Sequence, residues 1–213
     1  MAKRILNMTA EEMTHATKSE LIEAIAGSEG RFLASETIGI TIPLLTDVTN
    51  AEFAASMGAD LILLNMFDVQ EPKIMALPEV EKEETVREVK RLTGRMVGIN
   101  LEPVEESYAS DNKETLWEMS AGRYATVENA IQAQKMGVDL IVLTGNPGNG
   151  VSNPAIISSL KAISEAVGEK IMLAAGKMHA SGIIGEGGEN IITKEDIRQF
   201  AEAGADIILL PAP

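Results

Sequence analysis

The sequence predicts an α/β fold of the TIM (β/α)8-barrel type, because one pattern occurs three times along its 213 residues. In each copy a helix-like stretch ends in a glycine, an aspartate follows two residues later, and a short apolar run comes directly after it. A glycine just past a helix supplies the left-handed C-cap, and four or five apolar residues suit a strand buried on both faces. The copies are residues 57–64, 136–143 and 203–210.

Length and composition predict one compact domain over residues 1–213, with a helical extension at 1–29 and barrel units from residue 30 onward. No apolar run approaches the roughly 18 residues that a membrane helix needs, and no apolar signal core follows the first basic residues. A cytoplasmic protein without a membrane partner is therefore expected. Because the chain has no cysteine, disulfides, thiolate nucleophiles and cysteine zinc sites are excluded.

The net charge of -14 and the pI near 4.6 argue against nucleic acid as a partner. A small anionic substrate remains compatible with this charge, because a local pocket can oppose the global field.

The first elements follow from capping signals. Thr9 and Glu12 form a capping-box pattern, which predicts one helix running to Gly27, outside the barrel. The first strand is expected at 31–36, followed by a long loop at 37–48. A strand at 38–45 is the weaker alternative, because Gly39 and Pro43 disfavour a central strand.

Later elements alternate regularly between helix and strand. Each helix is placed between a capping residue and a glycine or strand, and each strand on an apolar run. Helices are predicted at 49–58, 79–92, 127–135, 154–167 and from 193 onward. The remaining strands are predicted at 61–65, 96–101, 140–143, 171–175 and 207–210.

This count gives about six βα units rather than eight, so the predicted barrel is incomplete. An apolar strand at 207–210 with an open edge is an association hazard unless it is covered. Three explanations stay open: the chain is a fragment or truncation, another copy covers the edge in a homo-oligomer, or the count is wrong.

Five segments carry a family resemblance: 47–52, 63–68, 100–103, 143–148 and 175–179. They resemble an uncharacterised bacterial TIM-barrel family that is labelled phosphoenolpyruvate phosphonomutase-like or haloacid dehalogenase-like, and whose members are usually longer. The resemblance runs from about Gly30 to residue 213 and implies a TIM barrel. A haloacid dehalogenase uses an Asp-x-Asp pair, which this sequence lacks, and the run of aspartates usual in the mutase superfamily is also absent.

Polar side chains at the predicted strand ends are the candidate site, because barrel enzymes build their active sites at the carboxyl ends of the strands. We expect substrate-binding roles for Glu36, Asn65, Asn100 and Thr144. Asp68 and Glu102, together with Glu36, are candidate oxygen ligands for Mg²⁺ or Mn²⁺. The alternative is that these acids are caps or solvated loop residues.

Lys177 and His179 follow the fifth predicted strand and are the candidate catalytic groups besides Glu102. Histidine suits a general base or acid because its unperturbed pKa lies near neutrality. Lys177 could act as an acid or a Schiff-base amine, although a structural or substrate-phosphate contact fits its position after a glycine better. A histidine tied to a backbone carbonyl is the structural alternative for His179.

The loop from Gly145 to Gly150, which includes Asn146 and Gly148, leads directly into a capped helix. Its backbone amides could therefore hold an anion, and a plain tight turn is the alternative. Together these residues favour an enzyme that acts on a small phosphorylated or carboxylated substrate by lyase or isomerase chemistry, through proton abstraction or carbon–carbon bond chemistry. The alternatives are a sugar-phosphate-binding or regulatory barrel without catalysis, and an inactive truncated fragment.

Overall fold

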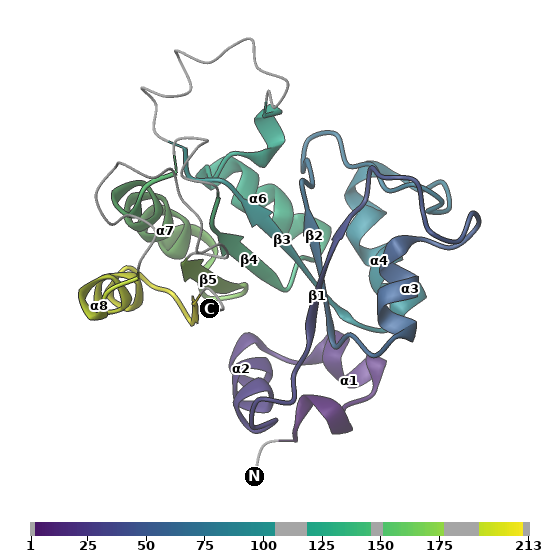
Figure 1. Cartoon of the computed structure of the whole chain (residues 1–213), viewed down its shortest axis with the longest axis horizontal. Helices are drawn as coiled ribbons and strands as arrows, with labels where there is room; N and C mark the ends of the chain where they lie inside the picture. Colours follow the sequence, from purple (N-terminus) through teal and green to yellow (C-terminus); the bar gives the residue numbers. More distant parts are fainter. Residues whose placement is uncertain (1–2, 105–118, 146–150, 177–191, 211–213) are drawn as a thin grey trace.

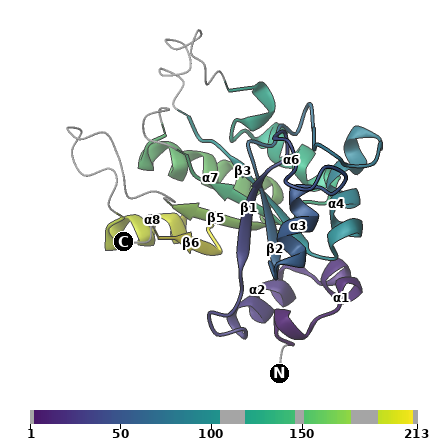
Figure 2. The same ribbon diagram turned by 45° about the vertical axis from the view of Figure 1, so that its right-hand side comes forward.

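The computed structural model describes residues 3–104, 119–145, 151–176 and 192–210. Within these ranges six strands form one parallel sheet in the order β1-β2-β3-β4-β5-β6. The sheet curls into a half-barrel, which confirms the predicted incomplete α/β barrel (Figures 1 and 2). The strands are β1 (Ala34–Ile38), β2 (Leu61–Asn65), β3 (Met96–Leu101), β4 (Leu140–Leu143), β5 (Met172–Gly176) and β6 (Ile207–Leu209).

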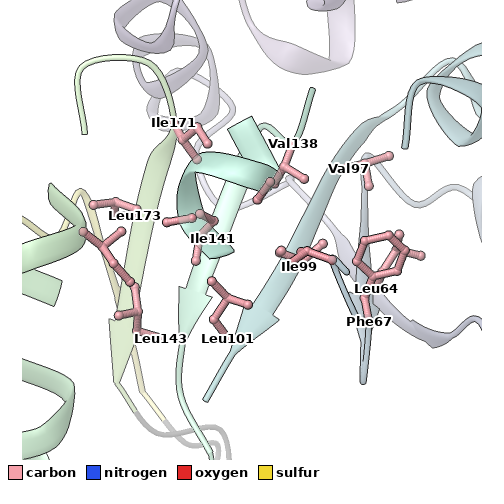
Figure 3. Packing of buried hydrophobic residues seen from close by; sticks show 14 of the residues in the cluster. Leu64, Phe67, Val97, Ile99, Leu101, Val138, Ile141, Leu143, Ile171 and Leu173 are labelled. Carbon is pink, nitrogen blue, oxygen red and sulfur yellow. The ribbon is translucent and has the colours of Figure 1, made fainter. Parts of the chain in front are cut away.

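One face of the sheet carries the helices that follow the strands, and the main core lies between them (Figure 3). Side chains alternate along each strand, so that Ile62, Val97 and Ile141 all point to this outer face. No helix among the described residues is long and apolar enough to cross a bilayer. The helices of this layer are α3 (Asn50–Ser56), α4 (Thr85–Thr93), α6 (Val127–Met136), α7 (Asn153–Val167) and α8 (Lys194–Glu202).

The inner face of the sheet has its own smaller apolar cluster, which includes Leu61, Met96, Leu140 and Met172. The amino-terminal helices pack against it, and Figure 1 shows them at the amino end of the strands. The single predicted helix is wrong. Thr17 and Glu20 form a second capping box, so a new helix begins there. The segment therefore contains the 3-10 turn η1 (Ile5–Asn7) and two helices, α1 (Ala10–His15) and α2 (Lys18–Ala26).

The repeated aspartate has a structural role that explains the three-fold pattern. In each copy its carboxylate accepts a hydrogen bond from a backbone amide at or next to the start of the preceding strand. The three bonds are Leu33 N to Asp60 (2.9 Å), Val97 N to Asp139 (2.9 Å) and Leu173 N to Asp206 (2.8 Å). In each case the aspartate amide also donates to the carbonyl of the same partner residue. The motif therefore pins the start of each strand to its neighbour.

Two of these aspartates also pair with lysines. Lys90 Nζ lies 2.8 Å from Asp139, and Lys18 Nζ lies 2.7 Å from Asp206, with all four side chains less than 20% exposed. Burial raises the pKa of Asp139, while the Lys90 ammonium and the hydrogen bonds oppose the shift. The Lys18 pair ties helix α2 to the loop before β6.

Two predicted boundaries are shifted. Strand β1 begins at Ala34 rather than at residue 31, and the alternative strand at 38–45 is wrong. The predicted helix at 79–92 begins later, with the 3-10 turn η2 (Lys82–Glu84) leading into α4. Gly94 ends α4 with φ 62°, and the repeat glycines Gly58, Gly137 and Gly204 all have positive φ, which confirms them at helix ends.

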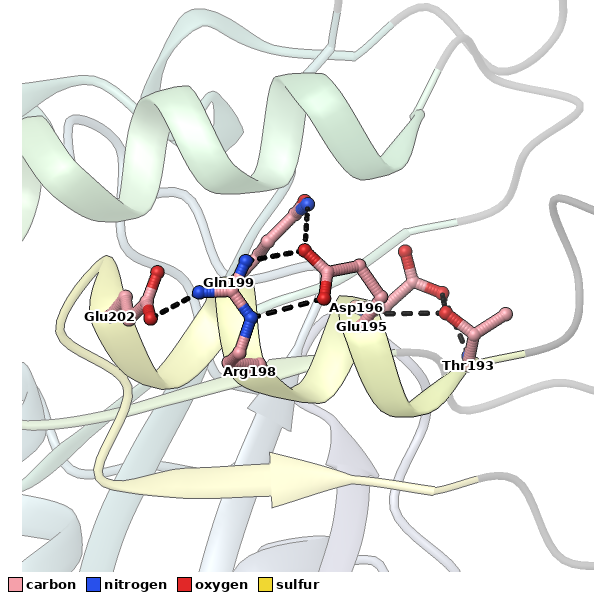
Figure 4. A network of polar contacts seen from close by, with 6 residues as sticks. All are labelled: Thr193, Glu195, Asp196, Arg198, Gln199 and Glu202. Carbon is pink, nitrogen blue, oxygen red and sulfur yellow. Dashed lines mark hydrogen bonds and ion pairs between the residues drawn. The ribbon is translucent and has the colours of Figure 1, made fainter.

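Helix α8 shows how a polar surface helix is held in place (Figure 4). Thr193 caps it in a capping box with Asp196, and Arg198 pairs with both Glu195 and Glu202. Hydrogen bonds from Arg198 and Gln199 lower the pKa of Glu195 to about 2. These contacts are exposed, so we assign the positioning of α8 to its buried Phe200.

Candidate functional site

The candidate site lies on the inner face of the sheet, at the carboxyl ends of the strands. The paired residues Ile99 and Ile141 face the outer core, so the flanking Asn100 faces inward. The same alternation turns Asn65, Glu102 and Thr144 inward from neighbouring strands or their ends. The structure therefore brings four predicted residues together on β2, β3 and β4.

Glu36 joins this group through a direct contact with β2. Asn65 Nδ2 donates to Glu36 Oε1 over 2.7 Å, across the β1–β2 pair. Glu36 itself is exposed, because β1 is an edge strand of the described sheet. The bond holds the amide of Asn65 in one orientation toward the inner face.

Asn100 and Thr144 are buried polar residues whose side-chain oxygens have no partner in the part of the chain that the structure describes. Asn100 is 8% exposed and Thr144 is 3% exposed. Neither Asn100 Oδ1 nor Thr144 Oγ1 has a hydrogen-bond partner within the described structure. Buried polar groups are nearly always satisfied, so two orphans at a barrel's carboxyl end mark a place for water or a ligand.

Glu102 follows β3 and is paired with Arg123, a residue that sequence reasoning did not single out. Their side chains are 7% and 15% exposed, and Arg123 Nη2 donates to Glu102 Oε1. The backbone joins them as well, since Glu102 N donates to Arg123 O over 2.9 Å. Arg123 ends the polar insert at 105–123, and no local sequence pattern singles it out there.

Asp68 lies just beyond β2, against the 3-10 turn η3 (Ala121–Arg123). Its Oδ1 accepts the backbone amides of Gln70 (2.8 Å) and Glu71 (3.0 Å). Burial alone raises the pKa of Asp68, but hydrogen bonds from Ser120 and from these two amides, with the charge of Arg123, hold it below its ordinary value. Asp68 is therefore a carboxylate that the protein already satisfies.

The turn η3 is fixed between the loops after β2 and β3. A Cβ on Gly122 would lie 1.8 Å from Asp68 Oδ1, so only glycine allows this approach. The buried Asn129 of α6 donates to the carbonyls of Ala121 (2.8 Å) and Tyr124 (2.9 Å). Arg123 is consequently held in place by its neighbours on both sides.

The predicted metal site does not fit these donors. Arg123 neutralises Glu102, two backbone amides and Ser120 occupy Asp68, and Asn65 contacts Glu36. Across the described ranges, no three His, Asp or Glu side chains are grouped so that they could hold a metal ion. No chemical step is therefore derived through Mg²⁺.

Several predicted site residues lie outside the described residues: Lys177, His179, Asn146, Gly148 and Gly150. Of the predicted anion loop, Gly145 is described. A Cβ at Gly145 would lie 2.5 Å from Val151 Cγ2, so the two ends of this loop meet closely before α7 begins. Ser152 caps α7 and Pro154 lies in its first turn, as the sequence predicts.

A groove of about 480 Å³ lies along β1, and of the predicted site residues it is lined by Glu36. Leu33, Thr37, Leu44, Phe53 and Met57 are among its lining residues, so both β1 and α3 contribute to its wall. Leu33, Leu44 and Met57 are more than half exposed. The homo-oligomer expected from an open edge stays a prediction.

Comparison with solved structures identifies the fold. The structure of 2,3-dimethylmalate lyase, described as a member of the PEP mutase/isocitrate lyase superfamily, matches with a TM-score of 0.53 and 13% identity. The match covers 94% of this chain and 62% of that one, so the chain spans about three fifths of that neighbour. The carboxyl transferase domain of Rhizobium etli pyruvate carboxylase matches with a TM-score of 0.51 and 17% identity, over 95% of this chain and 30% of that one.

These identities show a shared TIM-barrel fold alone. The phosphonomutase-like label expected from the resemblance agrees with the superfamily of the first neighbour, and the haloacid dehalogenase label stays a prediction. No curated protein matches the sequence. A family model described as a domain of unknown function (DUF7916) matches residues 6–213.

Proposed function

The chain belongs to the family of this domain of unknown function (DUF7916), whose description names no activity, and from its site we propose an enzyme that acts on a small phosphorylated or carboxylated substrate. The proposed chemistry is of the lyase or isomerase type, at the carboxyl ends of β2, β3 and β4. The observation that carries the proposal is the pair of buried, unpartnered oxygens on Asn100 and Thr144.

The physical argument rests on the cost of leaving such groups unpaired. A buried polar group without a partner costs about 1–3 kcal/mol, and a bound molecule that hydrogen-bonds to it recovers part of that energy. Asn65, Asn100 and Thr144 come from three neighbouring strands, so one small molecule can contact them together. In the proposed reaction His179 moves the proton, Lys177 assists it, and the loop from Gly145 to Gly150 holds the anionic end of the substrate.

The first experiment measures binding of a panel of keto acids and sugar phosphates by ligand-observed NMR. Asn100→Leu and Thr144→Val should each weaken binding about tenfold, because each removes a hydrogen bond to the substrate. Thr14→Val is the matched control, since Thr14 donates only to Ala10 O on the exposed helix α1. Unchanged binding in both site variants would contradict the proposed location.

A second candidate function is ligand binding without reaction, and one observation favours it. Glu102 is held in an ion pair with Arg123, so its Oε1 is already engaged and is not free to take a proton from a ligand. Turnover of a ligand that binds separates the two candidates. Loss of turnover with retained binding in His179→Gln supports the enzyme, whereas binding without turnover in the native chain supports a sensor or regulatory barrel.

A further inference from the structure

We propose that Arg123 supplies the fixed positive charge of this site, in the position for which the sequence predicts a divalent metal ion. The inference concerns the electrostatics of Glu102 and Asp68. Its second half, that Arg123 also contacts the substrate, rests on the proposed function.

The first argument is the charge balance at Glu102. A carboxylate that is 7% exposed needs a charged or hydrogen-bonding partner, and the guanidinium of Arg123 is that partner. A metal ion that bound Glu102 would lie beside this guanidinium, and two like charges at close range in a partly buried site repel strongly. Arginine keeps its charge at every accessible pH, so the repulsion cannot be relieved by deprotonation.

The second argument is that Asp68, the other predicted metal ligand, already has its hydrogen-bond partners. Its Oδ1 accepts the amides of Gln70 and Glu71, and Ser120 donates to the same side chain. The charge of Arg123 also stabilises the carboxylate of Asp68. One guanidinium thus serves both acids that the sequence suggests as metal ligands.

The third argument is rigidity, because a mobile arginine could swing aside and admit a metal. Arg123 belongs to η3, whose backbone is bonded to Glu102, to Val69 and to Asn129. The close contact between Gly122 and Asp68 leaves η3 no room to slide toward β2. The guanidinium is consequently preorganised, which is how a protein charge can replace an ion.

The guanidinium also retains a donor for a ligand. Arg123 Nε is buried without an acceptor in the described structure, whereas Nη2 is engaged by Glu102. An arginine has five N–H donors arranged as a fork that suits carboxylate and phosphate oxygens. An anionic substrate group is therefore the partner that the chemistry of Arg123 selects.

The test is a titration with Mn²⁺ alone, followed by electron paramagnetic resonance, which reports free Mn²⁺ without any substrate. The native chain and Glu102→Gln should give the same titration curve. Arg123→Met should gain an Mn²⁺ site that the double variant Arg123→Met/Glu102→Gln loses, because the freed carboxylate of Glu102 can then bind the ion. Arg91→Met, which removes the surface pair with Glu88, is the matched control and should gain none.

Binding of Mn²⁺ by the native chain that Glu102→Gln abolishes would overturn the proposal. A folded Arg123→Met variant that gains no site would overturn it as well. If Arg123→Met does not fold, the comparison of the native chain with Glu102→Gln decides alone. The Mn²⁺ titration needs no substrate, so its result tests the role of Arg123 independently. If no keto acid or sugar phosphate binds, that result contradicts the proposed function and leaves the role of Arg123 untouched. If a keto acid or sugar phosphate does bind, Arg123→Lys should weaken its binding about tenfold, and added chelator should not change its affinity.

Discussion

The two ends of the sheet treat their polar groups in opposite ways. At the amino end, Asp60, Asp139 and Asp206 each bind a backbone amide of the neighbouring strand, and lysines pair with two of them. At the carboxyl end, Asn100 and Thr144 leave buried oxygens without partners. The comparison teaches that the amino-end aspartates contribute stability, while Asn100 and Thr144 retain unsatisfied oxygens, as barrels do where they bind ligands.

The largest expected effect on stability comes from removing an aspartate at the amino end of the sheet. Asp139→Ala should lower the free energy of unfolding by about 3–5 kcal/mol, because it leaves Lys90 without its partner in a site that is 13–14% exposed. Asp60→Ala is the internal control, since among the described residues it removes one side-chain hydrogen bond and no ion pair, and it should cost about 1 kcal/mol. Urea denaturation measures both variants. Equal losses of unfolding free energy in the two variants would show that the Lys90–Asp139 ion pair contributes nothing to stability.

The next prediction tests the packing that holds Arg123. Gly122→Ala should lower the free energy of unfolding by about 1–3 kcal/mol, because the new methyl group collides with Asp68 Oδ1 and with Gln70 N. Combining it with Asp68→Ala should recover part of the loss, since one of the two collisions disappears. Stability unchanged by Gly122→Ala would mean that η3 is not held against β2.

A smaller effect, with the opposite sign, sharpens the contrast. Thr144→Val should raise the free energy of unfolding by about 1 kcal/mol, because it replaces an unpartnered buried hydroxyl with a methyl group of similar size. The same variant should bind ligand more weakly. A destabilised Thr144→Val would show that the hydroxyl has a partner in solution, and would remove one support of the proposed site.

The smallest expected effect is a pH dependence at Asp68. Its pKa is lower in the folded chain than its ordinary value, so the stability it contributes is present above that ordinary value. This stability is lost as the pH falls through the lowered pKa. Urea denaturation of the native chain and Asp68→Asn should therefore show a difference at pH 7 that shrinks in acid. A constant difference would rule out a contribution from ionised Asp68.

Prediction from sequence succeeded where the signal was local. Strands β2, β3 and β4 have the predicted bounds, because each is a mainly apolar, buried run that begins one or two residues after a turn glycine or an aspartate. The predicted bounds of strand β1 were wrong, because this strand is half exposed and has no apolar run to mark it. Its start is decided by pairing with β2, where Asp60 binds the amide of Leu33.

The strand-end rule likewise placed Glu36, Asn65, Asn100, Glu102 and Thr144 on one face, because side-chain alternation follows from backbone geometry alone. The hydrogen-bond and charge partners of these side chains, in contrast, do not follow from backbone geometry. Whether Glu102 meets a metal, water or an arginine depends on where η3 docks, 21 residues further along the chain.

By itself, therefore, the sequence determined the barrel class, the bounds of the buried strands β2, β3 and β4 and the inward set of polar residues, all through periodicity and capping. Only the tertiary structure decided that Arg123 neutralises Glu102 and that Asn100 Oδ1 and Thr144 Oγ1 lack partners among the described residues. Pairing of buried polar groups is a long-range property, set by which segments pack together rather than by any local pattern.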